Sequence, residues 1–374
     1  MLPSPILMAF ASILPALAPS ILVALIVSSL PVLAYDWLFA PWPPGNYITG
    51  WQGLSELPGA QIINDWPVSG TNNVISVYQS SGLDPSEVTR AIITAGGKIR
   101  DHWDYWMDIQ NVKMDLASRD PSFNPNTTSI MVPCFFAQVD VEAGSGTANT
   151  LYWDTNGWFN GHYAVGPNTD DKIGSFDVFD SIVEYYFNET LYPKMESLIF
   201  VGHSAAGQLV HRHSVMRKTS RHDDKIAWIV ANPASYVWLV EDRPVAVGDC
   251  DGVDDYKWGL SGNMPGYSTA DFDDIGREGI VSRFLKRYVH YALGTADTGS
   301  GDNACQSRTQ GSSHFERGQN YIAMLQAMPD GMPATQTIDL IEGISHNDIG
   351  MFNSTQLRQR MFKLNANDTS SLDM

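Results

Sequence analysis

Short apolar runs recur along the chain, separated by stretches rich in Gly, Pro, Asn and Asp. Runs with the length and the β-branched or aromatic content of strands occupy residues 74–78, 91–95, 129–133, 197–201 and 226–230, and later runs start at Tyr288 and Thr337. One helix is predicted over 176–186, where apolar residues stand at positions 176, 179, 182, 183 and 186. This alternation predicts an α/β protein with a mostly parallel central sheet and helices on both faces.

A second helix is predicted to start at residues 84–87, between the first two strands. Asp84 has an N-cap side chain, Pro85 suits the first helical position, and Glu87 is an acid in the first turn. We interpret this segment as structural, without a role in a site.

The run that starts at Ser197 ends in Gly202-His203-Ser204 and passes at once into a helix-like segment. Such a sharp turn holds a serine hydroxyl above the edge of a sheet and aims the next backbone N–H at the same point. We therefore predict Ser204 as a nucleophile and the N–H of Ala205 as an oxyanion donor. Because Gly-x-Ser is common in loops, the prediction depends on its partners.

Two later strands supply those partners. The run from Tyr288 ends at Asp297, and the run from Thr337 turns at Gly343 and leads to His346. A serine hydroxyl needs an imidazole to take its proton, and the imidazole needs a carboxylate to fix its tautomer. Taken singly, Ser204 and Asp297 could cap helices and His346 could be a surface loop residue. Together, in this order, they predict a catalytic triad.

The chain resembles the α/β-hydrolase superfamily, and within it a group of secreted fungal and bacterial serine hydrolases. The resemblance extends roughly over residues 91–352 and rests on the phrases Gly202–Gln208, Val230–Tyr236, Tyr256–Leu260, Gln310–Gly318 and Gly343–Asp348. It implies the α/β-hydrolase fold for residues 35–374, with an inserted lid at about 237–279 that sets substrate access. It also implies serine ester hydrolysis without a metal or an organic cofactor.

Two departures from the family pattern concern the site. The nucleophile turn usually reads Gly-x-Ser-x-Gly, whereas Ala206 stands at the second glycine position and Gly207 follows. We expect one methyl group to be tolerated there. The strand at 91–95 continues into Gly96-Gly97 where related enzymes often have His-Gly. Either Gly97 or Lys98 then provides the second oxyanion N–H, and the sequence leaves the choice open.

The chain is acidic, with a net charge of −18 and no lysine or arginine before Arg90. Nucleic acid is excluded as a partner, because phosphates require a basic surface. The acidic stretch 249–255 lacks the ligand spacing of a calcium loop, so we interpret it as a solvated loop and predict no metal site. Trp103, Tyr105 and Trp106 could wall an acyl pocket or belong to the core.

The first charged side chain is Asp36, and residues 1–34 are apolar with small residues near the end. They predict a cleaved secretory signal, with an uncleaved membrane anchor as the alternative. Asn126, Asn188, Asn353 and Asn367 are glycosylation acceptors by sequence. Cys250 and Cys305 are expected to form a disulfide in an oxidising compartment, and reduced thiols are the alternative.

The sequence thus predicts a serine hydrolase of the secretory pathway that cleaves carboxylic esters of small molecules or polymers. The same residues would serve an acyltransferase, a lactone-forming or lactone-opening enzyme, or a peptidase, because the acceptor depends on the shape and dryness of the cleft.

Overall fold

The structure is a computed structural model that describes residue 1 and residues 35–68 and 70–372. The residues described from 35 onward belong to one compact unit. Except for Met1, the predicted leader at 1–34 lies outside the described residues. Within the described ranges, no helix is long and apolar enough to cross a membrane.

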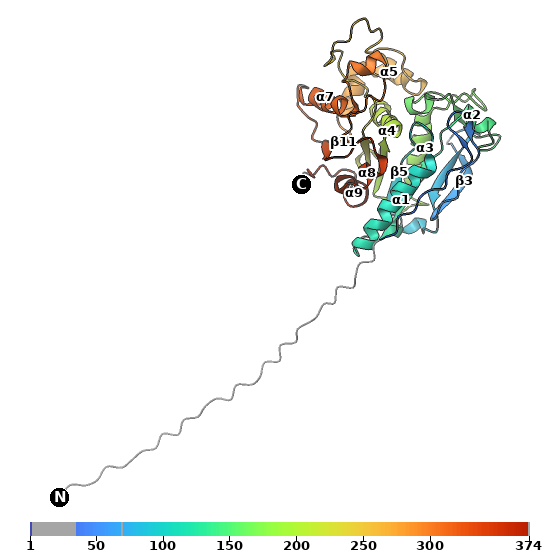
Figure 1. Cartoon of the computed structure of the whole chain (residues 1–374), viewed down its shortest axis with the longest axis vertical. Helices are drawn as coiled ribbons and strands as arrows, with labels where there is room; N and C mark the ends of the chain where they lie inside the picture. The colour runs from blue at the N-terminus through green and yellow to red at the C-terminus, as the bar shows by residue number, and fades with distance from the viewer. Residues whose placement is uncertain (2–34, 69, 373–374) are drawn as a thin grey trace. The chain divides into compact units, whose positions relative to one another are not determined.

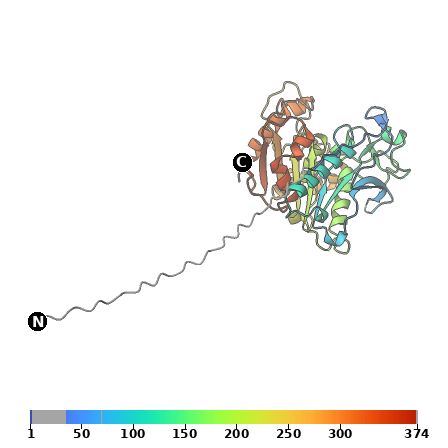
Figure 2. The ribbon, with the colours of Figure 1, turned by 60° about the horizontal axis from the view of Figure 1, so that its bottom comes forward.

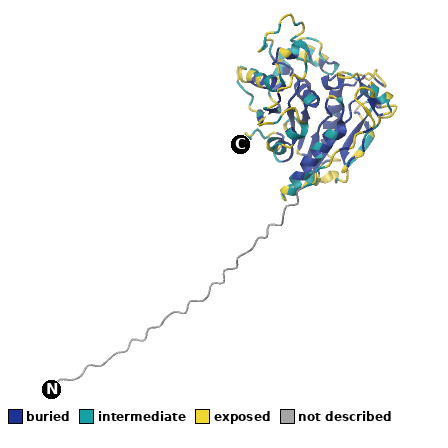
Figure 3. Cartoon of the chain, viewed as in Figure 1, coloured by how far each residue is buried: buried dark blue, intermediate teal, exposed yellow. Residues whose placement is uncertain are grey.

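An eight-stranded sheet forms the centre of the molecule, with the strand order β12-β11-β10-β9-β5-β6-β4-β3 (Figures 1 and 2). Its strands are mostly buried on both faces (Figure 3), which explains why they are continuous apolar runs in the sequence. Near one edge, β4 (Val74–Ser80) runs antiparallel to both of its neighbours, β6 and the edge strand β3 (Ala60–Pro67). The parallel strands are β5 (Arg90–Ile93), β6 (Thr128–Pro133), β9 (Ser197–His203), β10 (Ile226–Ala231), β11 (Tyr288–Gly294) and β12 (Gln336–Ile341).

Helices cover both faces of this sheet. The helix α1 (His102–Arg119) connects β5 to β6, and α4 (Ser204–Met216) connects β9 to β10. These connections run in opposite directions along the sheet, so right-handed crossovers place α1 and α4 on opposite faces. α8 contacts α1 and α9, α5 contacts α4, and α7 contacts β11. The remaining bounds are α3 (Ser175–Tyr186), α5 (Gly266–Phe284), α7 (His314–Gln326), α8 (Asp348–Phe352) and α9 (Thr355–Phe362).

Several smaller elements lie outside the central sheet. Two pairs of short strands, β1 with β2 and β7 with β8, stand apart from the central sheet. Their bounds are β1 (Gly45–Asn46), β2 (Gly50–Trp51), β7 (Phe136–Ala137) and β8 (Tyr152–Trp153), and the short helices are α2 (Gln138–Glu142) and α6 (Cys305–Arg308).

The neighbours β5 and β9 mark the point where the chain direction across the sheet reverses. From β5 the chain continues to β6 on one side, and from β9 it continues to β10 on the other. The connections therefore diverge at the carboxyl ends of β5 and β9 and leave a crevice, the usual ligand site of an open α/β sheet. The turn at Ser204 and the loop at Gly97 both lie at this point.

The strands predicted from the sequence are confirmed, and so is the helix at 176–186. The helix predicted to start at Asp84 is wrong. Asp84 does cap the segment by accepting from the Ser86 N–H at 3.0 Å, but only a single 3-10 turn, Pro85–Glu87, follows. The backbone of Val88 is already extended and β5 begins at Arg90, so no residues remain between the turn and the strand to continue a helix.

Candidate active site

Ser204 lies at the turn between β9 and α4. Its φ is 58°, in the left-handed region that residues other than glycine rarely adopt. A Cβ at Gly202 would lie 2.3 Å from the Ala206 carbonyl oxygen, and a Cβ at Gly207 would lie 2.6 Å from that of Ala231. In this turn the backbone therefore passes too close for a side chain at Gly202 and Gly207. Position 206 is not one of these two, which explains why alanine fits there.

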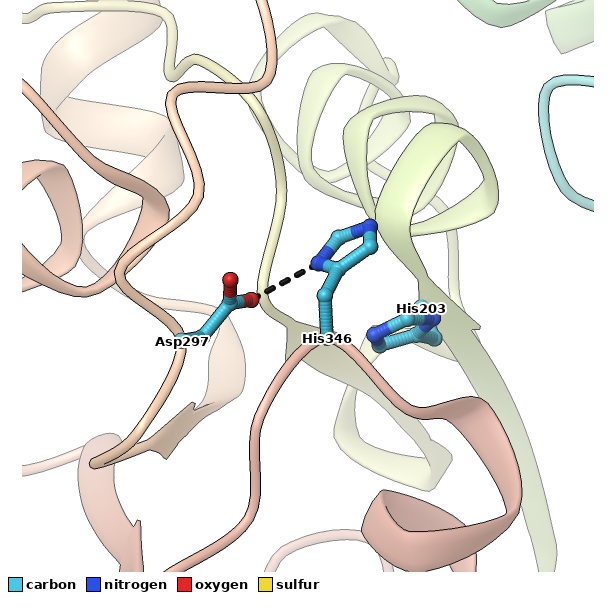
Figure 4. A group of neighbouring side chains, drawn as sticks. All are labelled: His203, Asp297 and His346. Atoms are coloured by element: carbon cyan, nitrogen blue, oxygen red, sulfur yellow. Dashed lines mark hydrogen bonds and ion pairs between the residues drawn. The ribbon is translucent and has the colours of Figure 1, made fainter.

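Ser204, His346 and Asp297 form one chain of hydrogen bonds although they are far apart in the sequence. His346 Nε2 lies 2.9 Å from Ser204 Oγ, and His346 Nδ1 lies 2.7 Å from Asp297 Oδ2. Figure 4 shows the imidazole pointing at the carboxylate. Asp297 follows β11 and His346 follows β12, so each is carried to the same edge of the sheet by a strand. The carboxylate is 1% exposed and the imidazole 35% exposed.

Two further histidines surround His346. The ring of His314 stacks on it with the centroids 4.1 Å apart, and His314 Nδ1 lies 3.1 Å from Asp297 Oδ1. The His203 ring lies 4.5 Å from the His346 ring on the strand β9 (Figure 4). No chemical pattern in the sequence selects His314. The indication in the sequence was that His314 lies within Gln310–Gly318, one of the segments on which the resemblance to α/β-hydrolases rests.

The charges of these groups follow from their surroundings. Burial raises the pKa of Asp297, but hydrogen bonds and charge from His314 and His346 outweigh burial and hold the pKa below its ordinary value. Asp297 is therefore an anion at neutral pH. Burial lowers the pKa of His203 well below its usual value, and the charge of His346 adds to this. His203 is therefore neutral.

Ala205 and Lys98 line the same cavity as Ser204 and carry candidate backbone donors. The N–H of Ala205 belongs to the first turn of α4, where helix donors have no partner within the helix. The N–H of Gly97 donates to Asp101 Oδ1 at 2.7 Å and is occupied. Among the described residues, no backbone hydrogen bond uses the N–H of Lys98. Of the two predicted second donors, Lys98 is thus the one left unoccupied.

The loop that carries Lys98 is held from both sides. Arg100 Nε donates to the buried carboxylate of Asp140 in α2 at 2.5 Å, and Trp51 Nε1 donates to the Ile99 carbonyl oxygen at 2.8 Å. These bonds fix the backbone beside Ser204 before any substrate binds.

A cavity of about 400 Å³ opens beside Ser204. Its wall includes Phe159 and Ala234 as apolar groups and Gln208, Lys98 and Lys257 as polar ones. Lys257 is the residue of the predicted lid segment 237–279 that reaches this wall. Trp103, Tyr105 and Trp106 do not line it, because all three are buried in the core.

The structure pairs Cys250 with Cys305 in a disulfide and leaves Cys134 as a buried thiol. The predicted acceptors Asn126, Asn188, Asn353 and Asn367 are all exposed, so glycans there would meet solvent. In the acidic stretch 249–255, Asp254 pairs with Arg243 and Arg277.

One group of described side chains has the composition of a metal site. Ligand atoms of His203, Asp297 and His346 lie within 4.8 Å of one another (Figure 4). Both nitrogens of His346 are already engaged, by Asp297 and by Ser204. These hydrogen bonds link the hydroxyl, the imidazole and the carboxylate in one chain.

The strand order, the turn at Ser204 and the crevice at β5 and β9 define the α/β-hydrolase fold. The chain matches no protein-family profile and no curated protein. Among solved structures it is similar to LpqC, a poly(3-hydroxybutyrate) depolymerase from Bordetella parapertussis, with 19% identity, a TM-score of 0.54 and coverage of 84% of this chain and 92% of that one. It is also similar to poly(aspartic acid) hydrolase-1 from Sphingomonas sp. KT-1, with 19% identity, a TM-score of 0.54 and coverage of 82% and 99%.

Proposed function

We propose that this protein is a carboxylic ester hydrolase in which Ser204 is the nucleophile. The hydrogen-bonded chain from Ser204 through His346 to Asp297 carries the proposal, with its distances of 2.9 and 2.7 Å. The names of the structural neighbours agree with it, since one is a depolymerase of a polyester and the other a hydrolase.

In the proposed reaction, Ser204 Oγ attacks the acyl carbon while His346 Nε2 takes its proton. Asp297 holds the tautomer in which Nε2 is free to accept that proton, and it stabilises the imidazolium that forms. The N–H groups of Ala205 and Lys98 stabilise the oxyanion. His346 then returns the proton to the leaving alcohol, and water, activated by the same imidazole, releases the acid from the acyl-enzyme.

Hydrolysis, rather than transfer to another acceptor, is supported by access to water. The side chain of His346 is 35% exposed, so water reaches the nitrogen that would activate it. Secretion is supported by the Cys250–Cys305 disulfide and by the exposed acceptor asparagines.

The test is the Ser204→Ala variant of the purified protein. The wild type should hydrolyse p-nitrophenyl butyrate and react with a fluorophosphonate probe, and the variant should do neither. Ser86→Ala is the matched control, because Ser86 is an exposed serine before the opposite end of β5. Labelling that persists in Ser204→Ala would overturn the assignment of the nucleophile.

A further inference from the structure

The cavity beside Ser204 has a cationic wall inside an acidic protein. Lys98 and Lys257 both line it, although the chain carries a net charge of −18. Neither lysine forms an ion pair with a described residue. Asp302 lines the same cavity, so with two lysines and one aspartate the wall keeps a net positive charge.

Lys257 is held in this wall by aromatic rings. Its Nζ lies 5.7 Å from the centre of the Phe159 ring and 5.1 Å from that of Trp258. The guanidinium of Arg212 also lies 5.7 Å from the centre of Phe159. Two cations therefore share one ring, which attracts each of them but leaves their mutual repulsion uncompensated.

The pKa of Lys257 reflects this crowding. Burial lowers it to about 8, and the positive charges of Arg212 and Lys98 contribute in the same direction. Asp302 opposes the effect from the same cavity wall. The site therefore favours a further negative charge.

Asp302 is committed to other partners. Its carboxylate accepts from Ser307 Oγ at 2.6 Å and from the Ala304 N–H at 3.0 Å. Gln208 adds a neutral donor to the wall, because its Oε1 already accepts from Arg212 at 2.7 Å. Oriented in this way, Gln208 keeps its amide NH₂ group for the cavity.

We propose that this cavity selects esters that carry a carboxylate, and that Lys257 binds the carboxylate with help from Gln208 and Lys98. This inference rests on the proposed function. A carboxylate suits the site better than a phosphate, because the two ammonium groups of Lys257 and Lys98, offset by Asp302, balance about one negative charge, and the wall provides no guanidinium fork.

The experiment compares isosteric pairs of substrates in which a carboxylate is replaced by an amide. Monoethyl adipate and ethyl 6-amino-6-oxohexanoate vary the acyl side, and 4-acetoxybutanoate and 4-acetoxybutanamide vary the alcohol side. kcat/KM is measured in a pH-stat at pH 7. The wild type should prefer the carboxylate in at least one pair by about 10- to 100-fold, the value of one charge-assisted hydrogen bond.

Lys257→Met keeps the aliphatic stem and removes the charge, so it should reduce that preference to near unity, mainly through KM. Lys225→Met is the matched control, since it makes the same change of charge just before β10, at the opposite end of the strands from Ser204. It should keep the preference. Thermal melting checks that Lys257→Met is folded. If it is not, Lys257→Gln is used in its place.

Equal rates within both pairs would overturn the inference, and so would a preference that survives in Lys257→Met. If none of the four compounds is hydrolysed, each is tested for its ability to protect Ser204 from fluorophosphonate labelling. Equal protection by the carboxylate and the amide of both pairs would also overturn the inference. Labelling of Ser204 in the same samples keeps the proposed function separate, because it reports the nucleophile whatever the charge preference.

Discussion

His314 Nδ1 lies 3.1 Å from Asp297 Oδ1, the carboxylate oxygen that His346 does not use. The buried carboxylate is therefore contacted on both oxygens, one by each histidine. Since the His314 ring also stacks on His346, one side chain supports both partners of Ser204. We infer that His314 is a positioning residue, which acts through Asp297 and His346.

Replacing His314 tests this role. His314→Leu removes the polar contact with Asp297 and the ring stacked on His346, and it should lower kcat roughly tenfold with little change in KM for a neutral ester. His314→Asn places an amide N–H near the position of Nδ1 and should recover part of the rate. Steady-state kinetics at pH 7 measure both. Equal losses of kcat in the two variants would contradict the positioning role.

The turn at Ser204 should depend on glycine at position 202 and not at position 206. In Gly202→Ala the new Cβ would lie 2.3 Å from the Ala206 carbonyl oxygen, so the backbone must shift and Ser204 should lose its reactivity. Fluorophosphonate labelling should fall at least about tenfold. Ala206→Gly, the matched control, restores the usual family pattern and should label like the wild type. Normal labelling of Gly202→Ala would show that the turn tolerates the methyl group.

The disulfide between Cys250 and Cys305 should stabilise the fold. It joins residues 55 positions apart, and closing a loop of that length stabilises the folded state by about 4 kcal/mol in the chain-entropy description. Urea unfolding of the wild type with reductant should match that of the double variant Cys250→Ala/Cys305→Ala, while the variant should not respond to reductant. A wild type that unfolds alike with and without reductant would contradict the prediction.

A group of carboxylates lies where α1 meets α8, behind the loop that carries His346. Burial raises the pKa of Asp108 to about 9 and that of Asp104 to about 6, and the charge of Asp348 adds to both. Burial also raises the pKa of Asp101 to about 7. Because these values exceed those of the unfolded chain, near 4, the folded state binds more protons between pH 4 and 9. Their contribution to stability is present in acid and is lost as the pH rises.

Asp108→Asn should therefore raise the melting temperature at pH 8 and leave it nearly unchanged at pH 4, where the wild-type carboxyl is protonated in the fold. Scanning calorimetry at the two pH values measures the difference. Asp273→Asn makes the same change on the exposed side of α5 and should have equal, small effects at both. An increase at pH 4 as large as that at pH 8 would show that charge is not the cause.

The sequence was informative wherever local chemistry decides structure. Buried parallel strands are continuous apolar runs, and the turn at Ser204 is marked by its own residues. The ends of β11 and β12 then led to Asp297 and His346, and in the structure His346 lies within hydrogen-bond distance of both Asp297 and Ser204.

What the sequence could not supply depends on contacts between distant segments. His314 becomes part of the site only because α7 brings it against Asp297. The choice between Gly97 and Lys98 depended on Asp101, whose side chain occupies the Gly97 N–H. Lys98, Phe159 and Lys257 come from three separate segments to line one cavity, and no local sequence pattern predicts that they meet.

Ser204 follows β9 and Lys98 follows β5, and these strands are hydrogen-bonded neighbours. The ladder keeps adjacent strands about 4.8 Å apart, so the sheet itself sets the spacing of the two strand ends from which Ser204 and the loop with Lys98 follow. Lys257, in contrast, arrives on a loop that no strand carries. Exchanging the loop between β10 and α5 should therefore change the charge of the cavity while the hydrogen-bonded chain of Ser204, His346 and Asp297 stays in place.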